Sequence, residues 1–450
     1  MDMRASRRAV LGTVGGGLVA AALPAGRALA AGPAFATMTP ATRLAARTDR
    51  RPVAGGVYDA TVNKTFISWG GRAEDTFVQA YDHASGTWTA PIRVLGGGSD
   101  SHNYPTMVQA ADGRLLIFVG VHNQRLVMAR SAQPRSITGT WTTTSIVQGP
   151  AASYPMPFRT ASGTLFVFFR ETTQELNASV PTDTRTMQFV RSTDNGVTWA
   201  SSKTLVGQSQ FVMGTTNRAD NMNEVYVGQL RLEPATAGRP ERVHFVWTLA
   251  GGGPSQHLHD SFHKDIYYAT FEPATMRFRS VTGLDVGTQV GPTDYDACRV
   301  VTTSLVRPAG LKSPDYIQQV GYLSDGRPFV VWMTFDDGGL IHNMAAVWSG
   351  SAWQSRQVAT GLRIREVERL GPTTWRVYAN REGTPNVQTF LLENGQTWSA
   401  ESTITTAREI QRVEVVTGFR DPARVLISGA SSNRDVAIAD GDIYVAGIPG

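Results

Sequence analysis

Two histidines flank one predicted hairpin, and imidazoles placed there could do acid–base chemistry. In the stretch SDSHNYPTMVQAADGRLLIFVGVHN, His102 and His122 lie at the two ends of a pair of apolar runs joined by an Asp-Gly turn. Neutral imidazole is the commonest general base near neutral pH. Either these are ordinary polar loop residues, or the two ends of the hairpin meet over a reaction site.

The next hairpin repeats this layout with different side chains. In SYPMPFRTASGTLFVFFRE, Tyr154 precedes an apolar strand and Arg170 follows it, as His102 and His122 do in the first stretch. If the two stretches are neighbouring units of one architecture, we expect the four side chains to form one cluster. Each also has an ordinary interpretation, as a turn cap, a strand end, a packed ring or an ion-paired arginine.

A cluster of this kind suits the removal of a proton next to a uronic-acid carboxylate. The planar fork of an arginine can bind a carboxylate and hold its developing charge. Histidine can serve as the base, and tyrosine or histidine as the acid for the leaving sugar oxygen. No metal or other cofactor is required for this scheme. Further candidates for substrate binding are Asn103 and Asn123, beside the two histidines, and Tyr226 in NEVYVGQLRL.

The strands that must position these residues are predicted from a repeat in the sequence. Its unit is a turn with Gly, an apolar strand, a gap, a second apolar strand and then Gly-x-Trp or a close relative. The copies recur at about 50 residues where nothing is inserted, a period typical of propeller blades. No segment has a long helical period. Seven copies can be counted, at 63–88, 112–141, 162–199, 241–278, 325–353, 373–398 and 423–447.

We therefore predict an all-β fold, a seven-bladed β-propeller, as a single domain over residues 31–450. Small sheets of this kind cannot bury both faces alone, and radial packing places sheet on sheet while leaving only short edges. We expect the start of the domain to supply a strand to the last blade and close the ring. STDNGVTW, at residues 192–199, matches the Asp-box, in which Asp and Gly build a tight turn and Trp packs between strands.

Residues 1–30 have the composition of an export signal. Arg7 and Arg8 precede an apolar, Gly/Ala-rich run of about 15 residues, too short for a spanning helix, which ends in a small-x-small site at residues 28–30. The paired arginines indicate a twin-arginine signal. We expect a secreted, extracellular protein with no membrane segment, and a monomer.

The charge of the chain narrows the class of binding partner. The formal net charge is +5, and Lys and Arg form no basic helix, so nucleic acid is not an expected partner. A mildly basic surface suits an anionic polysaccharide or oligosaccharide.

Cys298 is the only cysteine, so no internal disulfide can form and core packing must hold the domain together.

A structural zinc ion is a further hypothesis. His263 and Cys298 lie in two long insertions of the fourth unit, 250–264 and 283–320, and His342 follows a strand of the fifth. Histidine and cysteine are zinc ligands, although this spacing matches no compact zinc motif. Cys298 has a simpler interpretation as a small buried apolar residue.

These stretches, together with IYYATF and DGRPFVVWMTF, resemble the BNR-repeat family that includes the propeller-type ulvan lyases and related enzymes acting on rhamnose–glucuronate linkages. The resemblance runs through most of residues 31–450 and implies a seven-bladed propeller with its site in the central groove. It places His102 and His122 at the family's two site histidines, Tyr154 at its catalytic tyrosine and Arg170 at its carboxylate-neutralising arginine. Tyr226 matches a further family tyrosine. Some relatives carry a zinc ion.

The resemblance implies β-elimination. His102 or Tyr154 would remove the C5 proton of a glucuronate or iduronate, Tyr154 or His122 would protonate the leaving oxygen, and Arg170 would neutralise the carboxylate. Two alternatives stay open: a rhamnosidase-like glycoside hydrolase of the same propeller type, and a non-catalytic carbohydrate-binding propeller. Sialidases also use Asp-box propellers, but neither their arginine triad nor their Arg-Ile-Pro motif is evident in the sequence.

Overall fold

The computed structural model describes residues 32–47, 55–102, 104–119, 122–173, 184–208, 210–216, 218–220, 222–251, 262–303, 319–336 and 338–450. The chain divides into two units, Met1–Gly32 and Pro33–Gly450, and the structural description below concerns the second. No helix in these ranges is long and apolar enough to cross a membrane.

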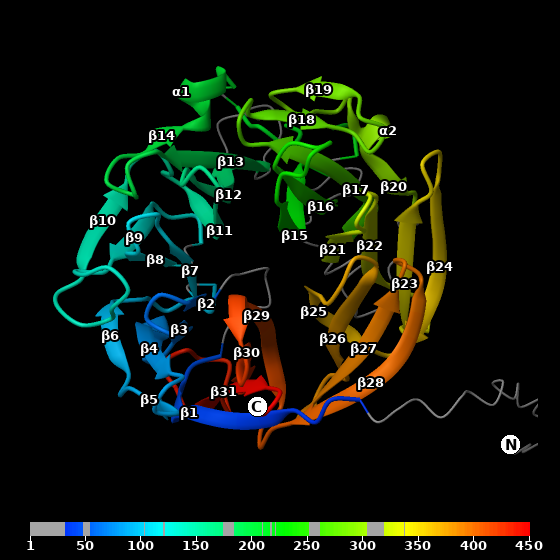
Figure 1. The fold of residues 1–450 in the computed structure, drawn as a ribbon. Helices are drawn as coiled ribbons and strands as arrows, with labels where there is room; N and C mark the ends of the chain where they lie inside the picture. The colour runs from blue at the N-terminus through cyan, green and yellow to red at the C-terminus, as the bar shows by residue number, and fades with distance from the viewer. Residues whose placement is uncertain are drawn as a thin grey trace, which may run out of the picture. The chain divides into compact units, whose positions relative to one another are not determined.

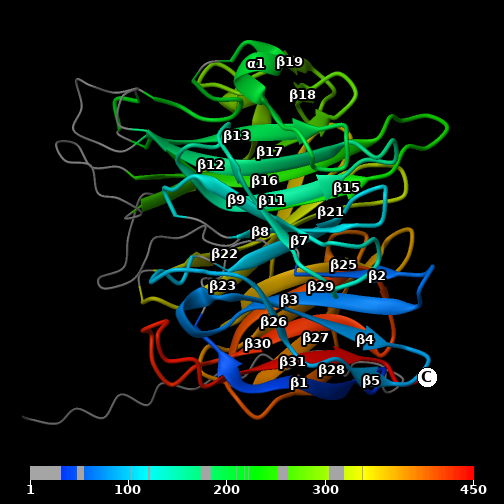
Figure 2. The same ribbon diagram turned by 90° about the vertical axis from the view of Figure 1, so that its left-hand side faces the viewer.

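The architecture of Pro33–Gly450 is all-β, as predicted, with sheets that follow one another around a common centre (Figure 1). The strands nearest the centre are β2, β7, β11, β15, β21, β25 and β29, and their sheets extend outward from them. Seen from the side, the strands lie in tilted layers stacked one above another (Figure 2).

The two ends of this unit meet in a sheet of nine strands. The N-terminal strand β1 pairs antiparallel with β31, the last strand, as expected from the sequence. One parallel pair, Val57 with Thr417, joins this part to the strands that follow β1 along the chain. In order, the strands are β1 (Ala36–Ala45), β31 (Gly441–Gly447), β30 (Ala423–Gly429), β29 (Ile410–Arg420), β2 (Gly56–Asp59), β3 (Lys64–Gly70), β4 (Thr76–Asp82) and β5 (Thr87–Trp88), with β6 (Ile92–Leu95) also on β4.

A second large sheet has ten strands, and its two halves are joined by a single parallel pair, Arg185 with Glu224. One half comprises β11 (Ala152–Arg159), β12 (Leu165–Thr173), β13 (Thr184–Ser192) and β14 (Ala200–Ser201). The other comprises β15 (Glu224–Glu233), β16 (Arg242–Gly251), β17 (Phe262–Glu272), β18 (Arg277–Arg279), β19 (Asp285–Gly287) and β20 (Arg299–Val301).

Three sheets have four antiparallel strands each. They are β7 (Pro105–Gln109), β8 (Leu115–Val119), β9 (Leu126–Arg130), β10 (Thr142–Ile146); β21 (Gln319–Tyr322), β22 (Pro328–Phe335), β23 (Ile341–Trp348), β24 (Trp353–Thr360); and β25 (Arg363–Arg369), β26 (Thr374–Asn380), β27 (Asn386–Glu393), β28 (Thr397–Thr405). The described helices are short: the 3-10 turn η1 (Arg72–Glu74), α1 (Ser202–Val206) and α2 (Tyr295–Cys298).

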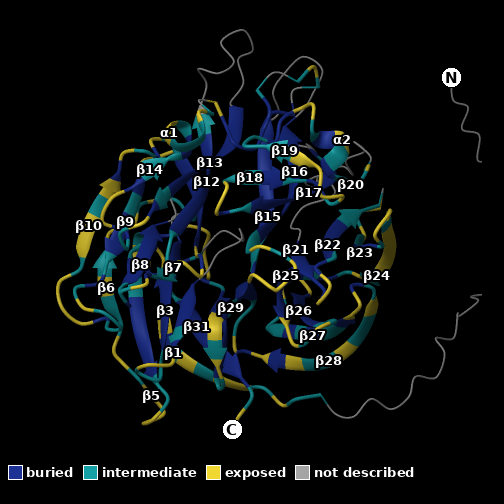
Figure 3. Ribbon diagram, turned by 45° about the horizontal axis from the view of Figure 1, so that its top comes forward, coloured by how far each residue is buried: buried dark blue, intermediate teal, exposed yellow. Residues whose placement is uncertain are grey.

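The second strand of each set is almost entirely buried because it is covered on both faces. All five residues of β8, Leu115–Val119, are buried, and the outer strand β10 is mostly exposed. Figure 3 shows the same gradient, with dark inner strands and an exposed rim. A sheet packed between two neighbours needs continuous apolar runs rather than alternation. These runs are the strands that the sequence repeat detected.

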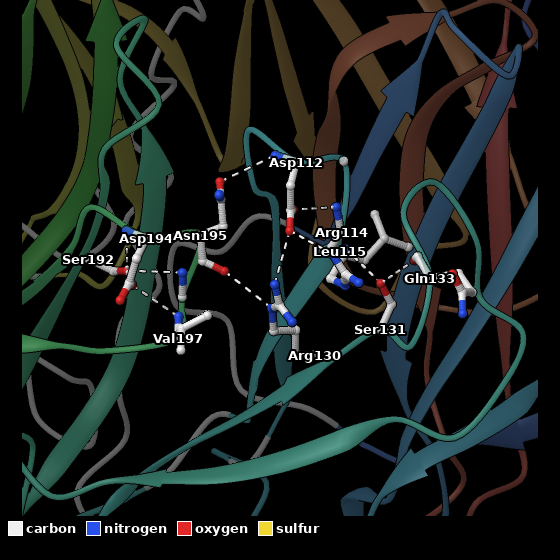
Figure 4. Close-up of polar contacts among 12 residues, drawn as sticks. Asp112, Arg114, Leu115, Arg130, Ser131, Gln133, Ser192, Asp194, Asn195 and Val197 are labelled. Atoms are coloured by element: carbon white, nitrogen blue, oxygen red, sulfur yellow. Dashed lines mark hydrogen bonds and ion pairs between the residues drawn. The ribbon is translucent and has the colours of Figure 1, made fainter.

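The predicted turn at 192–199 forms and links two sheets (Figure 4). Gly196 has φ +80 and its N–H donates to Ser192 Oγ at 2.9 Å, while the N–H of Thr198 donates to Asp194 Oδ1 at 2.9 Å. Asn195 accepts from the Asp112 N–H of the neighbouring sheet at 3.2 Å. The turn therefore ties two adjacent sheets together.

Candidate active site

A single carboxylate holds both predicted site histidines. Asp100, in the loop before β7, accepts a hydrogen bond from the His102 Nδ1 and one from the His122 Nδ1, the latter at 2.8 Å. The His102 N–H also donates to Asp100 Oδ1 at 3.0 Å, which closes a tight Asx turn. The two imidazoles stack with their centroids 4.0 Å apart and their planes 20° apart.

The other two predicted residues complete the cluster. The Tyr154 ring lies 5.6 Å from the His102 ring and 6.4 Å from the His122 ring, centroid to centroid. The Arg170 guanidinium lies between two tyrosine faces, with its Cζ 4.6 Å from the centroid of Tyr154 and 4.6 Å from that of Tyr226. The structure thus brings together all four residues of the two hairpins, and Tyr226 with them.

Backbone geometry explains how Tyr154 enters this cluster. Its φ is +56, a conformation that a bulky side chain rarely adopts. It lies where the pairing of β11 with β12 shifts register between Ser153 and Met156, so the strand bulges. Strained residues of this kind concentrate at functional sites because the surrounding structure must hold them there.

One detail of the sequence prediction was wrong. Arg170 does not follow its strand but is the sixth residue of β12, paired with Met187 of β13. The strand continues past the polar residue because the β12–β13 ladder runs on to Thr173 and Thr184. As a result the guanidinium is buried, with 1% of the residue exposed, instead of standing at an open strand end.

The charges of the cluster act on one another. Burial alone would raise the pKa of Asp100, but the hydrogen bonds from His102 and His122 outweigh it and hold that pKa well below its usual range. Burial lowers the pKa of His122, the charge of Arg170 and any proton taken up by His102 lower it further, and the bond to Asp100 opposes them. His122 is therefore neutral near pH 7, beside an ionised Asp100.

The predicted substrate-binding asparagines are placed less clearly. Asn103 lies outside the described residues. Asn123 is exposed, with φ +56, and its side-chain oxygen accepts from Ser153 Oγ at 3.3 Å and from Thr172 Oγ1 at 2.5 Å. These bonds tie the loop that carries His122 to the next sheet, so the observed contacts of Asn123 are structural.

The predicted zinc ligands do not come together in the part of the chain that the structure describes. His263 is buried beside Tyr226, with ring centroids 4.9 Å apart. Cys298 is buried in α2, and burial raises the pKa of its thiol to about 12. Both ring nitrogens of His342 bond elsewhere, Nδ1 with Gln357 and Nε2 with Asp336, at 3.0 Å each.

Among the described residues, one group of His, Cys, Asp or Glu is compact enough to suggest a metal ion: Asp100, His102 and His122. The ring stack argues against it. Nitrogen lone pairs lie in the plane of their own ring, and two nearly parallel rings with centroids 4.0 Å apart do not direct their lone pairs at one ion. This geometry fits shared hydrogen bonds to a carboxylate and does not fit a metal ion.

Sequence reasoning missed two layers of the site. Asp100 was not singled out, although its place two residues before His102 is the signal of an Asx turn. Beneath the cluster, Tyr104 is fully buried, and the Arg412 Cζ lies 4.7 Å from its ring centroid. Arg412 pairs with the buried Glu414 at 2.6 Å. No local motif marks Arg412 and Glu414, which come from the start of β29 at the opposite end of the chain.

Comparison with known proteins identifies a family and relatives of this chain. Residues 64–360 match the sequence profile described as "BNR repeat-containing family member" (BNR_4). A protein named Ulvan Lyase-PL25 from Pseudoalteromonas sp. (strain PLSV) is 23% identical over 265 residues, 52% of this chain and 50% of that protein. An ulvan lyase from Alteromonas sp. (strain LOR) is 24% identical over 259 residues, with the same coverage of 52% and 50%. The chain spans about half the length of these curated relatives.

Solved structures share the fold. A polysaccharide lyase described as PL25 ulvan lyase superposes with a TM-score of 0.68 at 17% identity, covering 91% of this chain and 96% of that one. The same values hold for that protein bound to -[GlcA(1-4)Rha3S]-. The polysaccharide lyase Uly1 gives a TM-score of 0.58 at 10% identity, covering 93% of this chain and 99% of that one.

Proposed function

The chain belongs to the BNR repeat-containing family, and we propose that it is a polysaccharide lyase that cleaves an ulvan-like, uronic-acid-containing polysaccharide by β-elimination. The observation that carries this proposal is the cluster of Asp100, His102, His122, Tyr154 and Arg170, hereafter the histidine cluster. It combines a neutral base, a phenol and a cation around one place, and elimination needs those three groups.

The reaction needs a proton acceptor and a proton donor on the uronate. The base removes the proton from C5, the electron pair forms the C4–C5 double bond, and the C4–O bond to the leaving sugar breaks. The leaving oxygen then takes a proton from the acid. Water is not consumed, so the product is an unsaturated uronate and a new sugar end.

The electrostatics favour one assignment among those open from the sequence. His122 has a lowered pKa, which makes it a poor proton donor at neutral pH. Tyr154 is then the acid for the leaving oxygen, and His102 is the base for C5. Phenols in water hold their proton to about pH 10, so a phenol gives it up only when the leaving oxygen develops charge.

Arg170 supplies positive charge, but its position gives it a particular role. Because the guanidinium lies between the Tyr154 and Tyr226 rings, it acts directly on Tyr154 and stabilises negative charge on the phenol oxygen after proton transfer. The two rings cover the faces of the guanidinium, so its in-plane N–H edge is the part that can reach a substrate carboxylate. Because only 1% of the residue is exposed, the proposed neutralisation of the carboxylate by Arg170 includes a local opening on binding.

We further propose that the strands form seven blades around the histidine cluster. Antiparallel sets of consecutive strands support this count once the nine- and ten-stranded sheets are divided at their single parallel pairs, Val57 with Thr417 and Arg185 with Glu224. We also propose export through the twin-arginine signal of residues 1–30, which a substitution of both Arg7 and Arg8 by lysine should block.

The test is incubation of the protein with ulvan and a panel of other uronic-acid polysaccharides, with product followed by ultraviolet absorbance. A lyase produces an absorbing unsaturated uronate, and a hydrolase produces new reducing ends without absorbance. His102→Gln should bind the polysaccharide but release no absorbing product. New reducing ends without ultraviolet absorbance would show that the protein is a hydrolase and not a lyase. Binding with no product from the wild type would leave a carbohydrate-binding protein.

A further inference from the structure

One negative charge serves two imidazoles in the histidine cluster. Asp100 uses one carboxylate oxygen for His102 and the other for His122, and it bonds to the Nδ1 atom of each ring. Its side chain is 36% exposed, while those of His102 and His122 are 23% and 22% exposed. The carboxylate thus reaches solvent at one side and orients both rings at the other.

The protonation state of Asp100 fixes the tautomer of both rings. Its pKa lies well below the usual range, so the carboxylate is ionised at any pH near neutral. An ionised carboxylate only accepts hydrogen bonds, and therefore both Nδ1 atoms must carry the proton. In the neutral imidazoles the lone pair is then on Nε2, the nitrogen turned away from Asp100.

We propose that Asp100 is a positioning residue that holds His102 and His122 in the Nδ1–H tautomer and makes the pair carry at most one extra proton. The inference rests on the proposed function for its catalytic meaning, but the tautomers themselves do not depend on it. Stacked rings 4.0 Å apart repel each other when both are charged, and a single carboxylate offsets only one positive charge. The pair thus offers one basic Nε2 for C5 even when the other ring is protonated.

The groups around the pair reinforce this restriction. Arg170 on β12 lowers the pKa of His122, as does the neighbouring His102. Tyr154 on β11 faces both rings without a permanent charge. Glu74 of η1 is fully buried, and burial raises its pKa well above the usual range, with Arg412 of β29 opposing and Asp100 adding to the effect. Asp100 is the carboxylate that bonds to both rings.

The Asp100→Asn variant distinguishes a role of Asp100 in positioning the rings from a role in supporting its loop. The amide of Asn has one accepting oxygen and one donating NH₂, so in Asp100→Asn one ring keeps its Nδ1–H while the other must accept at Nδ1 and carry its proton on Nε2. In serine proteases, replacing the aspartate of the Ser-His-Asp triad by asparagine causes the same loss of the correct tautomer and lowers kcat by about 10⁴-fold.

The experiment is nitrogen-15 NMR of histidine-labelled protein, which reports the tautomer of each ring directly. The chain has 8 histidines, and His102→Gln and His122→Gln assign the two signals. We expect both wild-type rings in the Nδ1–H form, one of them switched in Asp100→Asn, and neither fixed in Asp100→Ala. Asp112→Asn is the matched control, because Asp112 lies in the next turn and pairs with Arg114 and Arg130 at 2.8 and 3.0 Å.

Kinetics on the same variants form the second arm. Asp100→Asn should lower kcat by about 10²–10⁴-fold with little change in KM, and should move the acidic limb of the pH profile to lower pH because the pair loses its anion. Unchanged ring tautomers in Asp100→Asn would overturn the inference, whatever the activity. Wild-type protein with the expected tautomers but no absorbing product would overturn the proposed lyase and leave the positioning by Asp100 standing.

Discussion

The two ends of the inner strands carry charge in different ways. The histidine cluster lies at and before the start of β7 and β11, whereas the later residues of these strands, 107–109 and 156–159, line a cavity of about 610 Å³. At this far end the lining carboxylates bind arginines: Glu366 accepts from Arg231 at 2.6 Å, and Glu368 accepts from Arg376 at 3.0 Å. In the histidine cluster the carboxylate binds two imidazoles instead.

The ion pairs of the far end therefore stabilise the fold, whereas the histidine cluster is suited to proton transfer. An arginine keeps its charge at every relevant pH, so the ion pairs of the far end are fixed and tie strands that are distant in sequence. An imidazole changes its charge near neutral pH, so the histidine cluster can move protons. The far-end cavity is large enough for a ligand, but the pairing of Glu366 and Glu368 with arginines indicates a structural role for them.

The largest contrast should come from removing one phenol oxygen at each end. Tyr154→Phe should lower kcat on the accepted polysaccharide by about 10²–10⁴-fold, because the leaving oxygen loses its acid. Tyr58→Phe is the matched change at the far end, where the Tyr58 hydroxyl donates to Asn63 at 3.1 Å and the residue lines the cavity. It should leave kcat and KM unchanged. Equal losses in the two variants would show that activity does not reside at the histidine cluster.

The free energy of unfolding, in contrast to activity, should depend strongly on the ion pairs of the far end. Arg376 is 4% exposed and lies between two buried carboxylates, Glu368 and Glu401, with Nε 2.6 Å from Glu401. Arg376→Met leaves both carboxylates without this partner, which should reduce the free energy of unfolding by about 3–5 kcal/mol in denaturant titration. Arg327→Met, which removes an exposed pair with Asp325, should cost about 0–1 kcal/mol. Similar costs for the two would mean that the far end does not hold the ring together.

The sequence predicted the fold class better than it predicted these networks. The repeat detected the continuous apolar strands, and the paired layout of the two hairpins predicted that His102, His122, Tyr154 and Arg170 meet. Arg231 and Glu366 are 135 residues apart, and no local pattern connects them. Such pairs depend on which strands come to face each other, which a single sequence does not encode locally.

The site itself was predictable only in part for the same reason. Asp100 reaches His122, 22 residues away, through a loop whose path follows no periodic rule. The strained φ of Tyr154 and the burial of Arg170 between two rings arise from a register shift in β11 and a longer β12, and neither leaves a mark in residue composition. Residue types could therefore identify the members of the cluster, but not how they are held.

Acid should lower the free energy of unfolding through a buried histidine–glutamate pair close to the far end. His244 Nε2 lies 2.9 Å from Glu233 Oε2, and burial lowers the pKa of His244 to about 4, with the bond to Glu233 opposing. Between this value and its unfolded pKa of about 6.5 the unfolded chain binds more protons, so stability rises with pH across this interval and falls on acidification. Glu233, with a pKa of about 2, adds the same trend at lower pH.

The measurement is the free energy of unfolding of the wild type and of His244→Gln between pH 4.5 and 6.5. The wild type should lose on the order of 1–3 kcal/mol over this range on acidification. His244→Gln should be less stable at pH 6.5 but show a flatter dependence, since it has no imidazole to protonate. A slope unchanged by the substitution would assign the acid sensitivity to other groups.

The smallest effect should come from one hydroxyl that supports the loop of His122. Thr172 Oγ1 donates to Asn123 Oδ1 at 2.5 Å, and this bond ties that loop to β12. Thr172→Val keeps the shape and removes the bond, so kcat/KM should fall by about 3–10-fold while the free energy of unfolding changes by less than about 1.5 kcal/mol. Thr389→Val removes a comparable bond to the Ser402 carbonyl, at 3.3 Å, in an outer strand pair. If Thr389→Val lowers kcat/KM as much as Thr172→Val does, the activity loss reports general loosening of the sheets, and the loop of His122 has no special part in catalysis.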